Sequence, residues 1–352
     1  MKWNFLQNIT MKSKKANDSH ITVEHKVETE ENSFDVKLFI ANGINKSNSK
    51  DYNSALNLFN KAIEVDPNNY DAYLERSKVK LKLNDEKGSK QDLNIAGVLI
   101  EKLDAGLKAY DTGIEKYDAS DFNGAVEFFS KSIALNVIIP ENFYYRGLSK
   151  KYIDDIDGAL QDFNKTIEID PNFAKAYYNR GKIKYHKLKD IEGALVDYDK
   201  AIQLNSNDDD IYVSRAIVKS SIGNFEGALQ DCNKAIEINP SKGETYFSRA
   251  MEKFKQRDYN GSIMDLDIVI NLGLPDDSSF SLIDAHSIRG GLKSITHDFE
   301  GAVNDFSKAI QLDPNNGKLY FERSEARKEL GQTEQSLEDK LKAFKLGYEE
   351  TD

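Results

Sequence analysis

The pattern of apolar and polar residues in this chain repeats at a nearly constant interval. The stretch from Glu226 to Pro240 reads EGALQDCNKAIEINP, and close variants of it begin at Asp157 and Glu300. Aligning the chain on its Asp-Pro and Asn-Pro pairs gives a period of 34 residues, with apolar residues at helical spacing in both halves of the period. A fixed period of this length is typical of a solenoid, in which each unit packs only on its neighbours.

This register predicts nine units of two helices each, with helix A at positions 2–14 and helix B at positions 18–31. The units begin near Val36, Tyr70, Gly106, Pro140, Ala174, Asp209, Gly243, Ile283 and Gly317. The fifth unit holds one extra residue near 186–190, and residues 97–107 are expected to extend helix B of the second unit. We therefore expect an all-α chain with a single solenoid over residues 36–350. Thr333 and Lys340 replace apolar residues in the last unit, which is expected to act as a polar C-terminal cap.

Small and large residues occupy fixed positions in the units. Position 8 of helix A is Gly, Ala or Ser in every unit, and position 20 of helix B is Ala or Ser. Position 24 usually holds a large apolar residue, such as Phe129 or Phe163, and position 4 is usually aromatic. Small residues that face each other would let the two helices approach closely, with position 24 filling the core between them.

These residues resemble the tetratricopeptide repeat family. The resemblance rests on an aromatic residue at position 4, Gly at 8, Ala at 20, Phe or Tyr at 24, Ala at 27 and Pro at 32, and it covers nearly the whole chain. It implies a right-handed α-solenoid superhelix of antiparallel helix pairs. It also implies that helices A line a concave face that binds a peptide segment of a partner. Function is then expected where the copies differ, because the shared residues are explained by the scaffold.

The family's groove positions hold an uneven set of residues in this chain. The third to fifth units carry aromatic and basic residues there, namely Tyr110, Tyr117, Tyr144, Lys151, Tyr152, Lys175, Tyr178, Lys182 and Tyr185, with His186 among them. A smaller second patch consists of Phe247 and Phe254. Tyrosine has a large, rigid contact area and a polar tip, so this set predicts a peptide-binding groove. The alternative, that several of these tyrosines only cover neighbouring helices, remains open.

Arginine at position 7 and aspartate at position 23 occur together in seven units and are both absent from the first and third. The expected pairs are Arg76 and Asp92, Arg146 and Asp162, Arg180 and Asp197, Arg215 and Asp231, Arg249 and Asp265, Arg289 and Asp305, and Arg323 and Asp339. Joint occurrence favours structural ion pairs between helices A and B of one unit over an anion-binding stripe of arginines. Replacing Arg215 alone should then destabilise more than replacing it together with Asp231 by apolar residues. Position 11 is basic in all nine units, which indicates a solvated ladder beside the aspartates or, alternatively, part of a groove.

Composition narrows the possible functions. The net charge of -11 makes nucleic-acid binding unlikely, because phosphates require a basic face. A single cysteine, Cys232, excludes an internal disulfide and a cysteine-based zinc cluster, and the five histidines lack ligand spacing. Common catalytic motifs are missing, so we expect no enzyme activity, cofactor or metal. No apolar run has the length of a membrane span and no secretory signal is recognised, which predicts a cytoplasmic protein without membrane contact.

Together these observations predict a non-catalytic protein–protein interaction scaffold that binds a partner peptide or helix in the concave groove. An RNA-binding helical-repeat protein and a self-assembling structural adaptor are the alternatives. Residues 1–35 are polar and carry no repeat, so they are predicted to form a disordered tail.

Overall fold

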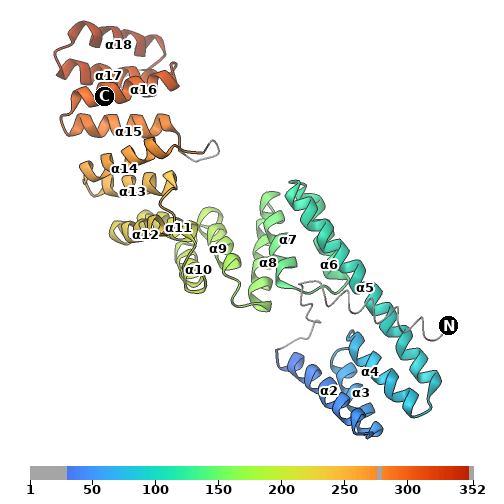
Figure 1. Ribbon diagram of the computed structural model, residues 1–352. Helices are drawn as coiled ribbons and strands as arrows, with labels where there is room; N and C mark the ends of the chain where they lie inside the picture. The colour runs from blue at the N-terminus through green and yellow to red at the C-terminus, as the bar shows by residue number, and fades with distance from the viewer. Residues whose placement is uncertain (1–29, 276–279, 349–352) are drawn as a thin grey trace. The chain divides into compact units, whose positions relative to one another are not determined.

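The computed structural model of the protein describes residues 30–275 and 280–348 (Figure 1). The predicted N-terminal tail therefore lies almost wholly outside the described residues. Every secondary-structure element within those two ranges is helical. The chain divides into two compact units, one up to Asn179 and the other from Arg180 onward, and each is described by itself.

Within the first compact unit, consecutive helices pack as antiparallel pairs. The helices are α2 (Glu30–Asn48), α3 (Tyr52–Val65), α4 (Tyr70–Lys82), α5 (Glu86–Asp118), α6 (Phe122–Ala134), α7 (Pro140–Tyr152), α8 (Ile156–Ile169) and the first residues of α9 (Ala174–Ile183).

The second compact unit continues the same pattern. It contains the end of α9, the π-helix η1 (Lys184–Leu188), α10 (Ile191–Leu204), α11 (Asp209–Ser221), α12 (Phe225–Ile238), α13 (Gly243–Lys255), α14 (Tyr259–Leu272), α15 (Leu282–Ile295), α16 (Phe299–Leu312), α17 (Gly317–Glu329) and α18 (Thr333–Lys345).

The turn from helix A to helix B has the same local cause in most repeats. In the turn between α7 and α8, Asp154 has a left-handed backbone with φ of 62°, and Asp155 follows it as the N-cap. The Asp155 carboxylate accepts a hydrogen bond of 3.0 Å from the backbone N–H of Gly158. A Cβ atom on Gly158 would lie 2.2 Å from that carboxylate, so a larger residue there would require the Asp155 side chain to move, and in α3 the equivalent cap forms with Ser54 at a longer 3.3 Å. The turns are therefore specified by short local sequence.

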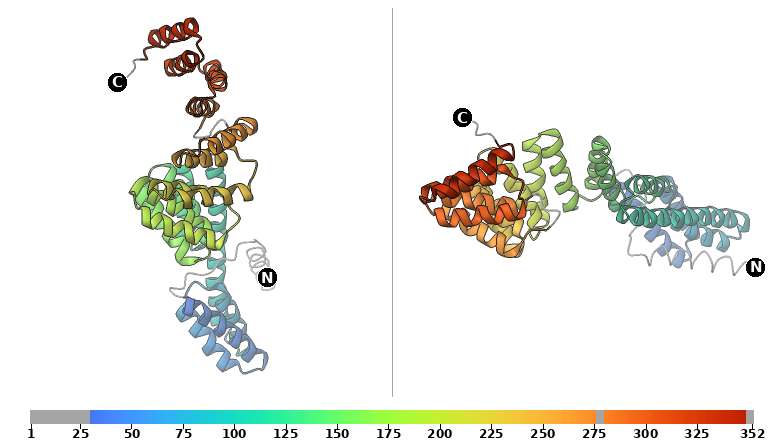
Figure 2. Two further views of the ribbon diagram at one scale, coloured as in Figure 1. Left: turned by 90° about the vertical axis from the view of Figure 1, so that its left-hand side faces the viewer. Right: turned by 90° about the horizontal axis from the view of Figure 1, so that it is seen from above.

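The long helix α5 departs from the expected pattern. Residues 97–107 do extend helix B of the second repeat, but they run on without a turn into helix A of the third, giving one 33-residue helix. Figures 1 and 2 show it as the long teal helix. The segment has no proline to end the helix, and Ala96, Ile100 and Leu103 are buried at helical spacing. The turn expected after the second repeat is therefore absent.

The extra residue of the fifth repeat is accommodated by the π-helix η1. The backbone N–H of Asp190 donates a 2.9 Å hydrogen bond to the carbonyl of Lys184, and Lys189 closes the turn with φ of 58°. A π-turn of this kind absorbs an inserted residue inside a helix. It also means that Tyr185 and His186 do not follow the regular helical register of the other repeats.

The core has the small and large positions that the sequence predicts. Phe129 at position 24 is fully buried, and a Cβ atom on Gly113 at position 8 would lie 2.7 Å from its ring. Phe163 and Gly147 repeat this arrangement between α7 and α8, at 3.0 Å. Helices A and B of one repeat thus approach closely because a glycine faces a ring. None of the helices between residues 30 and 348, outside the gap at 276–279, is long and apolar enough to cross a membrane.

Candidate functional site

Four aromatic side chains of the first compact unit gather near the end of α5. We call Tyr117, Phe122, Tyr145 and Tyr152 the aromatic cluster. The Tyr117 ring centroid lies 5.7 Å from Phe122, 5.5 Å from Tyr145 and 6.3 Å from Tyr152. Phe122 stacks on Tyr152 at 4.2 Å with the rings 10° apart. Tyr152 keeps 56% of its surface exposed, while the other three are partly buried. The cluster therefore exposes the Tyr152 ring to solvent while Phe122 stacks against it.

The turn between α5 and α6 brings this cluster together. Ser120 has a left-handed backbone with φ of 59°, and Asp121 caps α6 through the backbone N–H of Gly124. Tyr117 precedes this turn at position 12 of one helix, and Phe122 begins the next helix at position 17. Helix α7 then supplies Tyr145 and, from its last turn, Tyr152.

A polar group lies beside the exposed ring. The Lys151 ammonium nitrogen is 5.4 Å from the centroid of the Tyr152 ring and donates a 3.3 Å hydrogen bond to Asn179 Oδ1. Asn179 Nδ2 donates in turn to the Tyr144 hydroxyl at 3.3 Å and to the Lys175 carbonyl at 3.0 Å. A cation and an amide are thus held next to an aromatic surface.

Burial raises the pKa of several tyrosine hydroxyls in this region. It raises the pKa of Tyr117 to about 12, with a further contribution from the neighbouring Tyr152. Burial also raises the pKa of Tyr110 and of Tyr144 above the ordinary tyrosine value. These phenols act as hydrogen-bonding groups and contact surfaces at physiological pH, since none of them is a phenolate there.

The other predicted groove residues of the first compact unit differ in exposure. Tyr144 is only 7% exposed, and its ring contacts Phe163 and Phe173 at 6.0 and 5.0 Å. Tyr110 and Tyr178 are partly buried, and Lys175 is exposed. Tyr144 thus packs between helices, which was the alternative left open for some of these tyrosines.

The remaining predicted residues lie in the second compact unit. Tyr185 contacts His186 edge-on at 4.8 Å within η1, and Lys182 is partly buried. Burial, together with the charge of Lys182, lowers the pKa of His186. In the second patch, Phe247 is 2% exposed and stacks on Phe280 at 4.1 Å, whereas Phe254 is 38% exposed and lies 6.1 Å from Tyr259. Only Phe254 offers surface in that patch.

Sequence reasoning missed Phe122 and Tyr145 as members of the cluster. Both lie outside positions 2, 5, 9, 12 and 13, the helix A positions that usually face the groove in this family. A signal for Phe122 was present, because position 17 is aromatic in Tyr52, Phe122, Phe225, Tyr259 and Phe299. An aromatic residue directly after the turn can cover the residue that precedes the turn, as Phe122 does with Tyr117.

The predicted arginine–aspartate pairs all have bidentate geometry. Arg215 donates from Nε and Nη2 to the two carboxylate oxygens of Asp231, at 2.9 and 2.5 Å. The same fork occurs in Arg76–Asp92, Arg146–Asp162, Arg180–Asp197, Arg249–Asp265, Arg289–Asp305 and Arg323–Asp339. Each aspartate is buried, with at most 4% of its surface exposed. Paired nitrogens of this kind favour a structural role over an anion-binding stripe.

Two further contacts of these pairs were not foreseen. The basic residue at position 11 also reaches the aspartate, as Lys219 does with Asp231 at 2.8 Å, so this ladder is paired rather than merely solvated. The third arginine nitrogen bonds to position 25 of the preceding helix B. Six such bonds are Arg76–Asn60, Arg146–Ser130, Arg215–Asp199, Arg249–Asn233, Arg289–Asp267 and Arg323–Ser307. The arginines thus link neighbouring repeats as well as the helices of one repeat.

The lysine contact changes the expectation for Arg215. Once Arg215 is replaced, Asp231 still has Lys219 as a partner, so it is not left as an unpaired buried carboxylate. Replacing both Arg215 and Asp231 would in turn leave Lys219 without its acceptor. The single and double variants are therefore expected to differ less than the sequence alone suggested.

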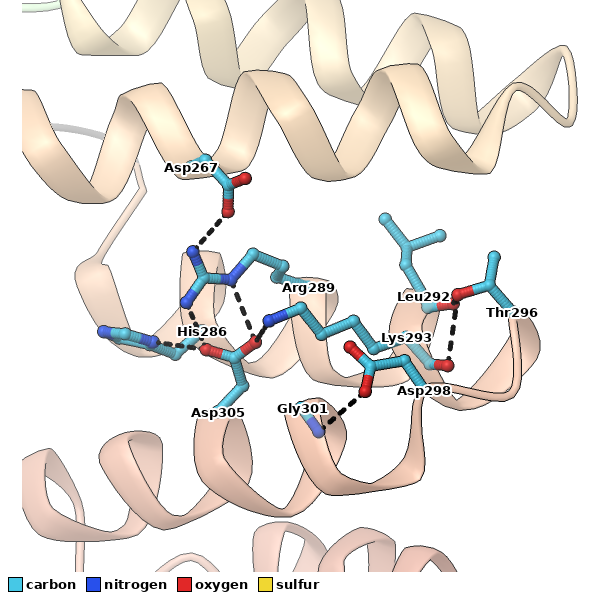
Figure 3. A network of polar contacts seen from close by, with 9 residues as sticks. All are labelled: Asp267, His286, Arg289, Leu292, Lys293, Thr296, Asp298, Gly301 and Asp305. Atoms are coloured by element: carbon cyan, nitrogen blue, oxygen red, sulfur yellow. Dashed lines mark hydrogen bonds and ion pairs between the residues drawn. The ribbon is translucent and has the colours of Figure 1, made fainter.

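The eighth repeat contains a variant of this network (Figure 3). In other repeats the arginine lies under the aromatic residue at position 4, as Arg215 does at 5.8 Å from the Tyr212 ring. Here position 4 is His286, whose Nδ1 lies 3.0 Å from Asp305 Oδ1. Arg289 and Lys293 bind the same carboxylate, so Asp305 has three cationic or imidazole partners. Within the described part of the chain, no group of three or more His, Cys, Asp and Glu side chains is placed to hold a metal ion.

Comparisons with known proteins identify the repeat. The tetratricopeptide repeat family model matches residues 45–69, 174–208 and 209–242, and a further TPR repeat model matches residues 153–187. A search of curated proteins finds no match. Among solved structures, pilF of Pseudomonas aeruginosa is 15% identical and superimposes with a TM-score of 0.53, covering 65% of this chain and 99% of that chain.

Two other solved structures have lower TM-scores. The C-terminal part of a TPR repeat-containing protein from Cytophaga hutchinsonii is 17% identical with a TM-score of 0.46, covering 80% of this chain and 97% of that chain. YrrB, described as a TPR protein with an unusual peptide-binding site, is 20% identical with a TM-score of 0.46, covering 52% of this chain and 91% of that chain. At such identities the likeness concerns the fold alone. With the family matches and the paired helices, the chain is a tetratricopeptide repeat protein, a solenoid of antiparallel helix pairs in a family that is typically non-catalytic.

Proposed function

We propose that this protein is a non-catalytic scaffold that binds a peptide or helical segment of a partner protein at the aromatic cluster. The observation that carries the proposal is the Tyr152 side chain. It is 56% exposed, and its ring stacks on the Phe122 ring with 4.2 Å between the two centroids. A rigid, partly exposed aromatic ring loses little conformational entropy on binding and is a frequent binding hot spot. Tetratricopeptide repeat proteins generally bind peptides or proteins, which agrees with this role.

The chemistry around the ring suggests the kind of segment that binds. Tyr152 and Tyr117 supply apolar contact area, while Lys151, held by a hydrogen bond to the buried Asn179, supplies a positive charge beside it. Lys175 adds a second positive charge, exposed at the start of α9. A segment that places an apolar side chain on the rings and an acidic group beside Lys151 would satisfy both.

Binding should depend on Tyr152 and Lys151 more than on neighbouring surface residues. Replacing either by alanine is expected to weaken partner binding by about tenfold, because each loss removes a contact at the centre of the site. Partners would be captured from a lysate of the native organism with the wild-type protein, and the affinity of the captured segment for each variant would then be measured by calorimetry.

Two variants serve as controls. Ile153→Ala removes a neighbouring apolar side chain of 38% exposure that lies outside the cluster, so it should leave the affinity unchanged. Phe254→Ala tests the second patch. If Tyr152→Ala and Lys151→Ala bind as tightly as Ile153→Ala, the proposal is wrong. A loss confined to Phe254→Ala would move the binding site to the second compact unit.

A further inference from the structure

Packing between neighbouring repeats follows one rule in this chain. Apolar residues at positions 21 and 28 of helix B pack on positions 10 and 3 of the next helix A. Leu56 packs on the core cluster that contains Val79 of α4, and Ile63 packs on the one that contains Ala72. Near the other end, Val303 and Ile310 belong to the core of Leu319 and Ala326 in α17. The receiving residues Ala72, Val79, Leu319 and Ala326 are at most 2% exposed.

The last described helix, α18, leaves this packing face open. Leu337, Leu341 and Phe344 occupy positions 21, 25 and 28 and are 60%, 53% and 72% exposed. The polar residue Lys340, which suggested a cap in the sequence, instead lies 2.7 Å from Glu325 of α17. Three large apolar side chains on one helix face are unusual for a solvent-facing surface.

The first described helix, α2, has the complementary face. Its position 3 is Leu38, which is 42% exposed although the same position is buried in α4 and α17. Ala41 and Asn45, at positions 6 and 10, are exposed and uncharged. At the positions that receive a preceding helix B, the α2 face therefore offers one apolar residue and two small or uncharged ones.

Helix α5 provides a comparison, because each of its halves has packing positions that no separate neighbouring helix covers. Because α5 is continuous, its first half has no separate helix A after it, and positions 21 and 25 there are the exposed Lys90 and Asn94. Its second half has no separate helix B before it, and positions 3, 6 and 10 there are the exposed Lys108, Asp111 and Glu115. The packing positions at this internal site are thus polar or charged, although Ile95 and Val98 nearby on the first half are 41% and 52% exposed.

The residue at position 25 of α18 indicates which kind of helix A can pack on α18. At six junctions between described helices, position 25 carries an oxygen acceptor for the arginine at position 7 of the following helix A. In α18 this position is Leu341, which has no acceptor, so an arginine-bearing helix A would lose that bond there. Helix α2 has Asn42 at position 7 and needs no such acceptor. The other helix A without the arginine is the charged second half of α5.

We propose that α18 of one copy of this protein packs on α2 of a second copy, as consecutive repeats do within the chain. Such a contact joins two different surfaces, so each copy keeps one free face of either kind. Copies would then add end to end, either in an open series or until a ring closes. The proposal is independent of peptide binding at the aromatic cluster.

The test uses the full chain and two surface variants, Leu337→Glu with Phe344→Glu on α18, and Leu38→Glu on α2. The mass in solution would be measured by sedimentation and light scattering up to ~1 mM, which reaches weak associations. The wild-type mass should rise with concentration past two chains, and each variant alone should remain a monomer. An equal mixture of the two variants should form a complex of two chains and no more, because one intact α18 face and one intact α2 face remain.

Met264→Glu is the matched control, because Met264 is 66% exposed on α14 and should tolerate the charge without effect on association. Circular dichroism would check that all variants keep their helix content. A wild-type protein that stays monomeric throughout the concentration range would overturn the proposal, and would fit coverage of α18 or α2 by residues 1–29. Association of the Leu38→Glu variant by itself, or no complex in the mixture, would also overturn it, the former pointing to pairing of two α18 helices.

Discussion

Replacing Asp305 by asparagine is expected to lower the free energy of unfolding of its repeat by about 3–5 kcal/mol. Asp305 is 1% exposed and binds Arg289, Lys293 and His286. Asparagine has nearly the same size but no charge, so it leaves two cations without their buried partner. Removing one member of a buried ionic network is costly because the remaining charges have lost water as well as their partner.

Hydrogen exchange of the amides in α15 and α16 would measure this effect locally, since the repeats of a solenoid can open separately. Asp267→Asn is the matched control. Its carboxylate also binds Arg289, at 2.5 Å, but is 49% exposed, so its loss should cost less than ~1 kcal/mol. Equal losses in the two variants would show that burial of the Asp305 network is not what stabilises the repeat.

The Asp305→Asn variant also tests how the stability of the repeat depends on pH. Burial by itself would raise the pKa of Asp305, but hydrogen bonds from Arg289, Lys293 and His286 outweigh it and lower the pKa below 3.8. Since the folded pKa is below the unfolded one, the carboxylate contributes stability above the unfolded pKa, and this is lost as the pH falls through the folded pKa. The difference between wild type and Asp305→Asn should therefore be largest near neutral pH and shrink below about pH 4.

Replacing Phe129 by alanine is expected to cost about 3–5 kcal/mol, because this fully buried ring fills the core between α5 and α6. Gly113→Ala should also destabilise, by about 1–3 kcal/mol, because the new Cβ atom would lie 2.7 Å from the Phe129 ring. Combining Gly113→Ala with Phe129→Leu should cost less than the sum of Gly113→Ala and Phe129→Leu made separately, since the smaller side chain leaves space for the methyl group.

Denaturant unfolding of Gly113→Ala, Phe129→Leu and the double variant completes this cycle. Gly291→Ala provides the control for helix propensity, because no atom lies within 4 Å of a Cβ atom at that position in α15. It should be neutral or stabilise by up to ~1 kcal/mol. Strictly additive costs for Gly113 and Phe129 would show that the glycine is not required by the ring.

The sequence predicted the repeats well because their causes are local. A left-handed residue followed by an Asp or Asn cap forms most turns from helix A to helix B, as at Asp154 and Asp155, and the cap residue recurs at a constant place in the sequence. The small residue opposite position 24, such as Gly113 opposite Phe129, and the joint occurrence of Arg215 and Asp231 also leave clear patterns, because the small residue recurs in every unit and the pair in seven of the nine. The division of the chain into nine units in one solenoid remains a prediction.

By itself, then, the sequence determined the helices, most of their turns and the pairs that join them, since each depends on residues at constant spacing. Only the tertiary structure decided which residues form a surface. Tyr144 and Tyr152 both belong to helix A of the fourth repeat, but the first is buried against Phe163 and the second is exposed over Phe122. Leu337 and Phe344 of α18 hold positions that are also apolar in interior helices, and Phe344 is exposed because no described helix packs on it. Exposure depends on what packs against a residue, and that neighbour comes from elsewhere in the fold.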